Sequence, residues 1–161
     1  MTRDEQFMAA ALELARQAGD RGEVPIGCVV TLGDEIVGRG CNSRETGKSA
    51  LNHAEVLAIG EACRNLGGWR LWQCRLYVTL EPCPMCAGAI INARIPTVVY
   101  GAKDPKAGSV DSLVRLFDVG YNHRPEVISG VLEEECAALL KDFFRRLREK
   151  KRLQRREAKA D

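Results

Sequence analysis

Four residues in two short motifs have the types and the spacing of a catalytic metal site. His53 and Glu55 form the first motif, and Cys83 and Cys86 form the second. Structural zinc is usually closed by four protein ligands, whereas catalytic zinc keeps three and leaves a position for water. We therefore predict that His53, Cys83 and Cys86 bind one zinc ion and that Glu55 handles protons beside it.

Both motifs are expected at the beginnings of helices. Cys83 and Cys86 are three residues apart, so they share one helix face, and the positive end of a helix favours thiolates. Glu55 follows His53 by two positions, about 200° round a helix of ~3.6 residues per turn. Glu55 therefore need not bind the same ion, and it can lie over the open coordination position.

This set of groups is suited to hydrolytic deamination. Catalytic zinc lowers the pKa of water from ~15.7 towards ~7. Glu55 would take a proton from that water, and the hydroxide would attack an sp² carbon bearing an amino group. Glu55 would then return protons to the ring nitrogen and to the leaving ammonia. The alternative is a closed structural site with His123 or another cysteine as fourth ligand, which leaves Glu55 without a role.

Helices and strands are expected to alternate around these motifs. The pattern predicts five helices: a capped helix from Thr2 to Gly19, a helix capped by Asn52 and ending near 66, a short helix after Pro84, a short helix near 112–117 and a long helix from 131 to about 156. It also predicts five strands, at 26–32, 35–41, 76–80, 97–100 and 125–129. Such alternation is typical of an α/β domain with a sheet between helices. We expect one domain over residues 1–156 and a frayed basic tail over 157–161.

Composition limits the class of protein. The 161 residues are 45% hydrophobic and 29% charged, which suits one globular domain, and no apolar run approaches the ~20 residues needed to cross a bilayer. Seven cysteines in irregular spacing favour a reduced cytoplasmic compartment over a disulfide framework. Residues 141–161 contain ten Lys or Arg but only four Asp or Glu, which predicts a polyanionic partner at this end.

Five further stretches carry a resemblance that extends from about residue 23 to residue 148. They are Glu-Val-Pro-Ile-Gly at 23–27, the segment around the two metal-ligating cysteines at 76–89, Val-Tyr-Gly-Ala-Lys-Asp at 99–104, Asn-His-Arg at 122–124 and the helical segment 135–144. With the two metal motifs, the sequence resembles the bacterial tRNA-specific adenosine deaminases of the cytidine/deoxycytidylate deaminase superfamily. The metal motifs are common to the superfamily, and the last two stretches narrow the resemblance to this family.

The resemblance implies a three-layer α/β/α fold with a central five-stranded mixed sheet. It also implies conversion of adenosine to inosine at the wobble position (34) of a tRNA anticodon stem-loop, one Zn²⁺ per subunit, and a homodimer whose RNA touches both subunits. Six positions match residues that contact RNA in the family. Asn42 and Asn122 would contact the flipped nucleotide. Asp104 and Lys106 would lie in a loop that contacts the target and its neighbours. Phe144 and Arg148 would contact other nucleotides of the anticodon loop.

Other interpretations of these residues and of the whole chain stay open at this stage. Asn42 and Asn122 could be turn residues, Lys106 ordinary surface, and Phe144 part of the core. A deaminase of a free nucleobase or nucleoside, guanine or cytosine, would share the four motif residues but would not need the basic last helix. A non-catalytic zinc-stabilised RNA-binding module is the third possibility, and it would not need Glu55.

Overall fold

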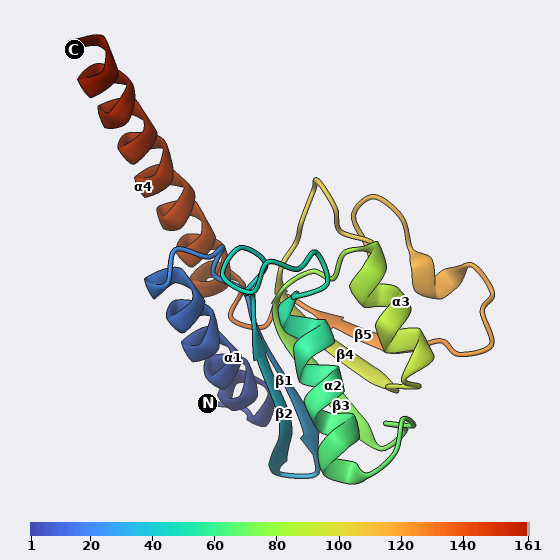
Figure 1. The fold of residues 1–161 in the computed structure, drawn as a ribbon. Helices are drawn as coiled ribbons and strands as arrows, with labels where there is room; N and C mark the ends of the chain where they lie inside the picture. The colour runs from blue at the N-terminus through green and yellow to red at the C-terminus, as the bar shows by residue number, and fades with distance from the viewer. Residues whose placement is uncertain (161) are drawn as a thin grey trace.

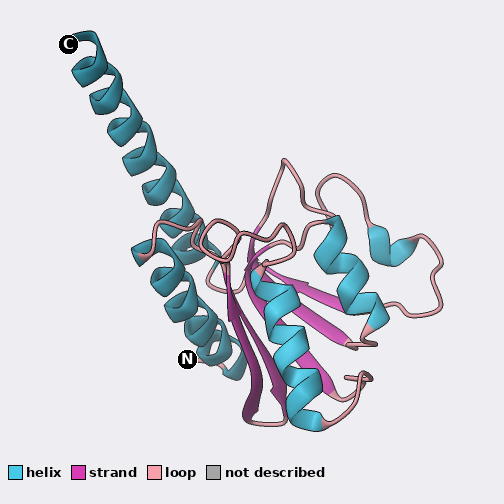
Figure 2. Ribbon diagram, in the orientation of Figure 1, coloured by secondary structure: helices cyan, strands magenta, loops and turns pink. Residues whose placement is uncertain are grey.

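In the computed structural model, which describes residues 1–160, a sheet separates two layers of helices (Figures 1 and 2). The elements are α1 (Arg3–Asp20), β1 (Gly27–Leu32), β2 (Glu35–Cys41), α2 (Ala54–Leu66), β3 (Cys74–Leu80), α3 (Pro84–Asn92), β4 (Thr97–Ala102), the 3₁₀ turn η1 (Leu116–Asp118), β5 (Glu126–Ser129) and α4 (Glu133–Ala160). The capping box predicted at Thr2 and Glu5 begins α1.

The sheet contains five strands in the order β2-β1-β3-β4-β5. β1 pairs antiparallel with β2 and β3, whereas β3, β4 and β5 run parallel to one another. The predicted three-layer fold with a mixed five-stranded sheet is therefore confirmed. Because β3 and β4 are parallel, the segments that follow them leave from the same edge of the sheet.

Alternate residues of the central strands face two separate apolar clusters. Val78 of β3 belongs to the cluster under α2 and α3, while its neighbour Tyr77 belongs to the cluster under α1 and α4. The same alternation places Val98 and Val99 of β4 in opposite clusters. Because both faces are covered, most residues of the central strands β1, β3 and β4 are buried, and these strands hold the helices at fixed positions on each side.

Two glycines of β2 let α2 approach the sheet closely. A Cβ atom on Gly40 would lie 2.2 Å from the carbonyl oxygen of Ala54, and one on Gly38 would lie 2.2 Å from that of Ala58. Any side chain at either position would push the helix away. The first turn of α2, which carries Glu55, is therefore held directly against the strand.

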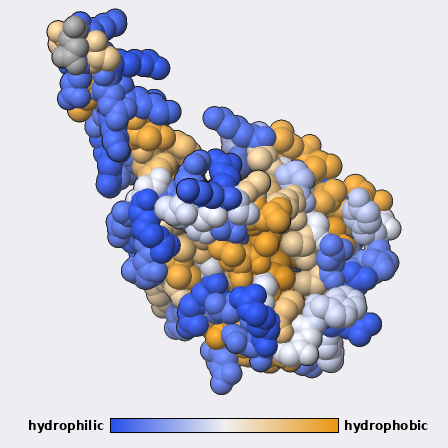
Figure 3. Space-filling model, viewed as in Figure 1, coloured by the Kyte–Doolittle hydropathy of each residue, from blue (hydrophilic) through white to orange (hydrophobic). Residues whose placement is uncertain are grey.

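The long helix α4 has two different parts. Near its start, Cys136 and Leu139 pack in the cluster against the sheet, but the later turns extend away from the body (Figure 1). Hydrophilic side chains cover most of this extension in the view of Figure 3. The helix continues to Ala160 and therefore includes residues 157–160 of the segment 157–161, for which we expected fraying. Fraying of this end in solution stays a prediction.

Several elements differ from those expected, and the largest differences concern α2, β3 and the segment 112–117. His53, not Asn52, is the N-cap of α2, because the backbone oxygen of Asn52 accepts from Ser43 in the preceding loop. β3 begins at Cys74, two residues before the expected start, and pairs there with Leu32. The helix expected near 112–117 is only the turn η1.

Among the helices of residues 1–160, none combines the length and the apolar character needed to cross a membrane.

Candidate active site

The three predicted metal ligands meet at one point. The Nδ1 atom of His53 lies 3.5 Å from the Sγ atoms of both Cys83 and Cys86. All three ligand atoms lie within 4.8 Å of one another, so this group could hold a metal ion. Cys86 is fully buried, whereas His53 and Cys83 are half-buried, so the cluster is open on one side.

Each motif places one of these side chains at the N-cap of a helix. His53 precedes α2 and Cys83 precedes α3, both with extended backbone and with no side-chain cap bond. The Cys86 thiol and the backbone amides of Cys86 and Met85 donate to Cys83 and, although burial opposes them, lower its pKa to about 5. The same pairing with Cys83, together with burial, raises the pKa of Cys86. The thiolate form of Cys83 is therefore favoured at the start of α3.

Glu55 lies beside the cluster, and its side chain is only 4% exposed. Burial is the main cause that raises its pKa to about 7, and the charge of Cys83 raises the pKa further. Its own backbone amide and the Cys86 thiol act in the opposite direction. A carboxyl group with this pKa can both accept and release a proton near neutral pH, as a general acid–base must.

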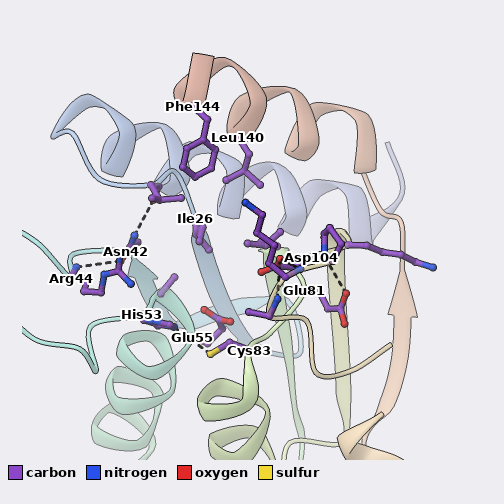
Figure 4. Close-up of a pocket in the computed structure, with 17 residues that line it drawn as sticks. Ile26, Asn42, Arg44, His53, Glu55, Glu81, Cys83, Asp104, Leu140 and Phe144 are labelled. Atoms are coloured by element: carbon purple, nitrogen blue, oxygen red, sulfur yellow. Dashed lines mark hydrogen bonds between the residues drawn. The ribbon is translucent and has the colours of Figure 1, made fainter. Parts of the chain in front are cut away.

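A pocket of about 460 Å³ opens above these residues (Figure 4). Below, it ends on His53, Glu55 and Cys83; these three residues and the buried Cys86 are here called the pocket floor. The pocket walls come from Val24, Ile26, Asn42, Arg44, Ala54, Leu80, Glu81, Lys103, Asp104, Pro105, Lys106, Ala107, Leu140 and Phe144. Its volume lies within the range of small-ligand sites.

Four of the six residues matched to RNA contacts line this pocket, and two do not. Asn42, Asp104, Lys106 and Phe144 are wall residues. Asn42 is buried, and its amide already donates to the Val24 carbonyl at 3.2 Å and accepts from the Arg44 amide at 3.2 Å. It still has a second N–H and a second lone pair for a ligand.

Asn122 and Arg148 are exposed and lie outside the pocket. Arg148 is on α4, one turn beyond Phe144, so it can reach a ligand only outside the pocket opening. His123, between Asn122 and the last strand, has its Nε2 atom 2.7 Å from the Ile95 carbonyl oxygen. That contact, remote from the cluster, agrees with a structural role and does not support a fourth metal ligand.

Sequence reasoning missed three residues at the pocket opening. Together with Lys106 and Phe144, the residues Arg44, Lys103 and Leu140 form what is here called the pocket rim. Leu140 and Phe144 point from α4 towards the floor in Figure 4. Their spacing of four residues places them on one helix face, and this signal could have been found in the sequence. Arg44 lies three residues after the end of β2 and Lys103 directly after the end of β4, and neither position gives a comparable signal.

Two buried glutamates hold the loops that form the walls. Glu23, 1% exposed, accepts hydrogen bonds from Glu45 and Thr46 in the loop after β2. Glu81, 2% exposed, accepts from several groups in the loop after β4. Burial alone would raise the pKa of Glu81, but hydrogen bonds from Ser112, Asp111 and Asp104 keep that pKa below its ordinary value.

A family model and a curated relative match nearly the whole chain. The model of the MafB19-like deaminase family matches residues 2–148. A "tRNA-specific adenosine deaminase" of Bacillus subtilis (strain 168) is 52% identical over 157 residues, which is 97% of this chain and 98% of that protein.

Two solved structures have the same fold. One comes from structural work on A-to-I editing by tRNA:A34 deaminases at the wobble position of transfer RNA. It is 48% identical in sequence and has a TM-score of 0.81, and the alignment covers 84% of this chain and 99% of that chain. A guanine deaminase from Nitrosomonas europaea is 25% identical with a TM-score of 0.71, over 86% of this chain and 83% of that chain.

Proposed function

Because the chain belongs to the tRNA-specific adenosine deaminase family, we propose that it converts adenosine to inosine at the wobble position of a tRNA anticodon. The identity of 52% over almost the full length of both chains carries this assignment. The guanine deaminase is a more distant relative, at 25% identity. The proposed reaction replaces the 6-amino group of the purine by oxygen, consumes water and releases ammonia.

The donor set of the floor fits one Zn²⁺ per chain. Zinc bonds of about 2.3 Å to sulfur and about 2.0 Å to nitrogen, at a tetrahedral angle, place N and S about 3.5 Å apart. The two distances from His53 Nδ1 to the cysteine sulfurs are both 3.5 Å. His53, Cys83 and Cys86 would hold the ion, which when bound would supply a water acidic enough to ionise near neutral pH.

Glu55 performs the proton transfers in this proposal. Its carboxylate accepts the proton that the attacking water loses and delivers it to the purine N1, then accepts the remaining proton of the new C6 hydroxyl group and delivers it to the departing amino group. Burial of the carboxyl group, which raises its pKa, suits both directions of transfer. Its burial excludes bulk water, so the proton passes between Glu55 and the substrate rather than to solvent.

The pocket and its rim suit a nucleotide that has left a single-stranded loop. A base must unstack before it reaches a buried floor, and an anticodon loop makes this step inexpensive. Asn42 can donate and accept at the base or ribose, Phe144 can stack an unpaired base, and Lys106 can contact phosphate. Asp104 shapes the loop that carries Lys106, since its Oδ1 atom accepts from the Lys106 amide at 3.0 Å.

Asn122 and Arg148 would contact RNA beyond the pocket. Both are exposed, and Arg148 belongs to the basic extension of α4. We also propose that the protein is a homodimer in which the RNA touches both subunits, and that it acts in the cytoplasm. The seven unpaired cysteines support a reducing compartment.

The deciding experiment offers an anticodon stem-loop with adenosine at the wobble position, beside free adenosine, cytidine and guanine. We expect inosine in the stem-loop and no ammonia from the free compounds, with Glu55→Gln as the inactive control. Ammonia from guanine or another free compound alone would replace the tRNA assignment by a small-molecule deaminase. RNA binding without any turnover would instead indicate a non-catalytic zinc module.

A further inference from the structure

Glu81 connects the metal site to a wall of the pocket. It follows β3 directly and stands two positions before Cys83. Its backbone amide donates to the Ala102 carbonyl at 2.8 Å, and the Pro82 carbonyl accepts from the Ser109 amide at 2.9 Å. The segment that presents Cys83 is thus joined on both sides to the segment that leaves β4.

The Glu81 carboxylate uses both oxygen atoms to hold the loop 104–112. Oε1 accepts from the Asp104 amide at 3.1 Å and from the Ser112 hydroxyl at 2.5 Å. Oε2 accepts from the backbone amides of Val110, Asp111 and Ser112 at 3.2, 2.9 and 2.9 Å. Five donors from one loop therefore converge on a single carboxylate that is 2% exposed. Such charge-assisted bonds in a buried place fix the geometry of the groups that make them.

The loop is closed so tightly around this carboxylate that only glycine fits at position 108. A Cβ atom there would lie 2.4 Å from the Glu81 carboxyl carbon and 2.5 Å from the Asp104 carbonyl oxygen. The Asp104 side chain continues the same arrangement, because it accepts from the amides of Lys106 and Ala107 at 3.0 and 3.3 Å. The positions of Asp104 and Lys106 in the pocket wall thus depend on Glu81.

We propose that Glu81 is a positioning residue that fixes the wall loop 104–112 relative to the pocket floor, so that the bound nucleotide meets Glu55 in the correct alignment. The inference rests on the proposed function, because it concerns how the deaminase substrate is held. Glu81 transfers no proton and binds no metal in this scheme. Its effect passes through Asp104 and Lys106.

Glu81→Gln tests this role with a nearly isosteric change. The amide keeps one acceptor oxygen but turns an NH₂ group towards backbone amides that can only donate. We expect full metal content, a rise of about tenfold in KM for the stem-loop and a smaller fall in kcat. Peptides covering 103–112 should exchange their amide hydrogens faster, because five anchoring bonds are weakened.

Two further variants make the test independent of that one substitution. Gly108→Ala leaves Glu81 intact but forces the loop off it, so it should give the same rise in KM and the same faster exchange. Glu61→Gln is the matched control, since Glu61 also accepts a backbone amide, that of Arg39 at 3.2 Å, but on α2 away from the pocket. Glu61→Gln should leave KM and exchange in 103–112 unchanged.

The positioning role would be overturned if KM is unchanged in both Glu81→Gln and Gly108→Ala. This outcome counts when both variants retain the metal and the wild-type protein is active. Loss of metal in both variants would also overturn it, because Glu81 would then only support the cysteine segment. If Glu81→Gln does not fold, Gly108→Ala decides alone. Absence of inosine with the wild-type protein would contradict the proposed function itself, and the inference with it.

Discussion

The floor and the rim of the pocket differ in burial, in charge and in the layer of the fold that supplies them. The floor comes from the first turns of α2 and α3, on one face of the sheet, and contains the buried Glu55 and Cys86. The rim comes from α4, on the other face, and from the loops after β2 and β4. Three of its five residues are exposed cations: Arg44, Lys103 and Lys106.

This division separates chemistry from recognition. The floor residues are fixed by helix starts and by close packing such as that at Gly40. The rim can therefore change in sequence without moving the floor, and different substrates can be presented to one reaction centre. The similar fold of a guanine deaminase at 25% identity agrees with this view. Substitutions in the floor should abolish the reaction, whereas substitutions in the rim should weaken binding by graded amounts.

The largest effect is expected from removing a ligand of the floor. Cys86→Ser replaces a buried sulfur by an oxygen that is a poorer zinc ligand. We expect bound zinc, measured by elemental analysis, to fall from about one per chain to near zero, with loss of inosine formation. Cys63→Ser is the control, because Cys63 is half-buried but lies outside the cluster. Full zinc content in Cys86→Ser would contradict its assignment as a ligand.

Glu55→Gln should stop the chemistry without disturbing the metal or the rim. The amide fills the same buried place but cannot accept and return a proton. We expect kcat to fall by about 10³-fold or more, while zinc content and stem-loop affinity remain within about twofold of wild type. Single-turnover kinetics and filter binding measure the two quantities separately. A fall in affinity as large as the fall in kcat would show that Glu55 serves binding and not proton transfer.

The floor could be predicted from sequence because it is local. His53 with Glu55 and Cys83 with Cys86 each lie within one helical turn, so residue type and spacing indicate their roles. Even here the cap of α2 was misassigned to Asn52, whose backbone is used by a loop contact to Ser43 that no local pattern encodes.

The rim could not be predicted in the same way because it depends on contacts between distant segments. Phe144 alone suits the core as well as the surface, and only the packing of α4 on the sheet brings it over the floor at 41% exposure. The helix expected near 112–117 failed for a related reason. The amides of Asp111 and Ser112 bind the side chain of Glu81, so the chain turns around that carboxylate instead.

Within the rim, Phe144 should have an intermediate effect. Stacking of one base on an aromatic ring contributes about 1–3 kcal/mol. We therefore expect Phe144→Ala to raise the Kd of the stem-loop by about tenfold, with zinc content unchanged. Phe144→Leu is the control for apolar contact alone, and it should recover only part of the loss. Equal affinity of both variants and wild type would place Phe144 outside the RNA interface.

The smallest effect should come from Arg148, on the exposed part of α4 beyond the rim. Arg145 on the same helix is already paired with Asp142 at 2.6 Å and Glu149 at 3.4 Å, whereas Arg148 has no ion pair within residues 1–160. A free guanidinium can neutralise a phosphate and release its counterion. Arg148→Ala should therefore lower the slope of log Kd against log salt by about 0.7–0.9, and Arg145→Ala by clearly less. Equal slopes for the two variants would contradict a specific phosphate contact of Arg148 and would mean that α4 meets the RNA only through its total charge.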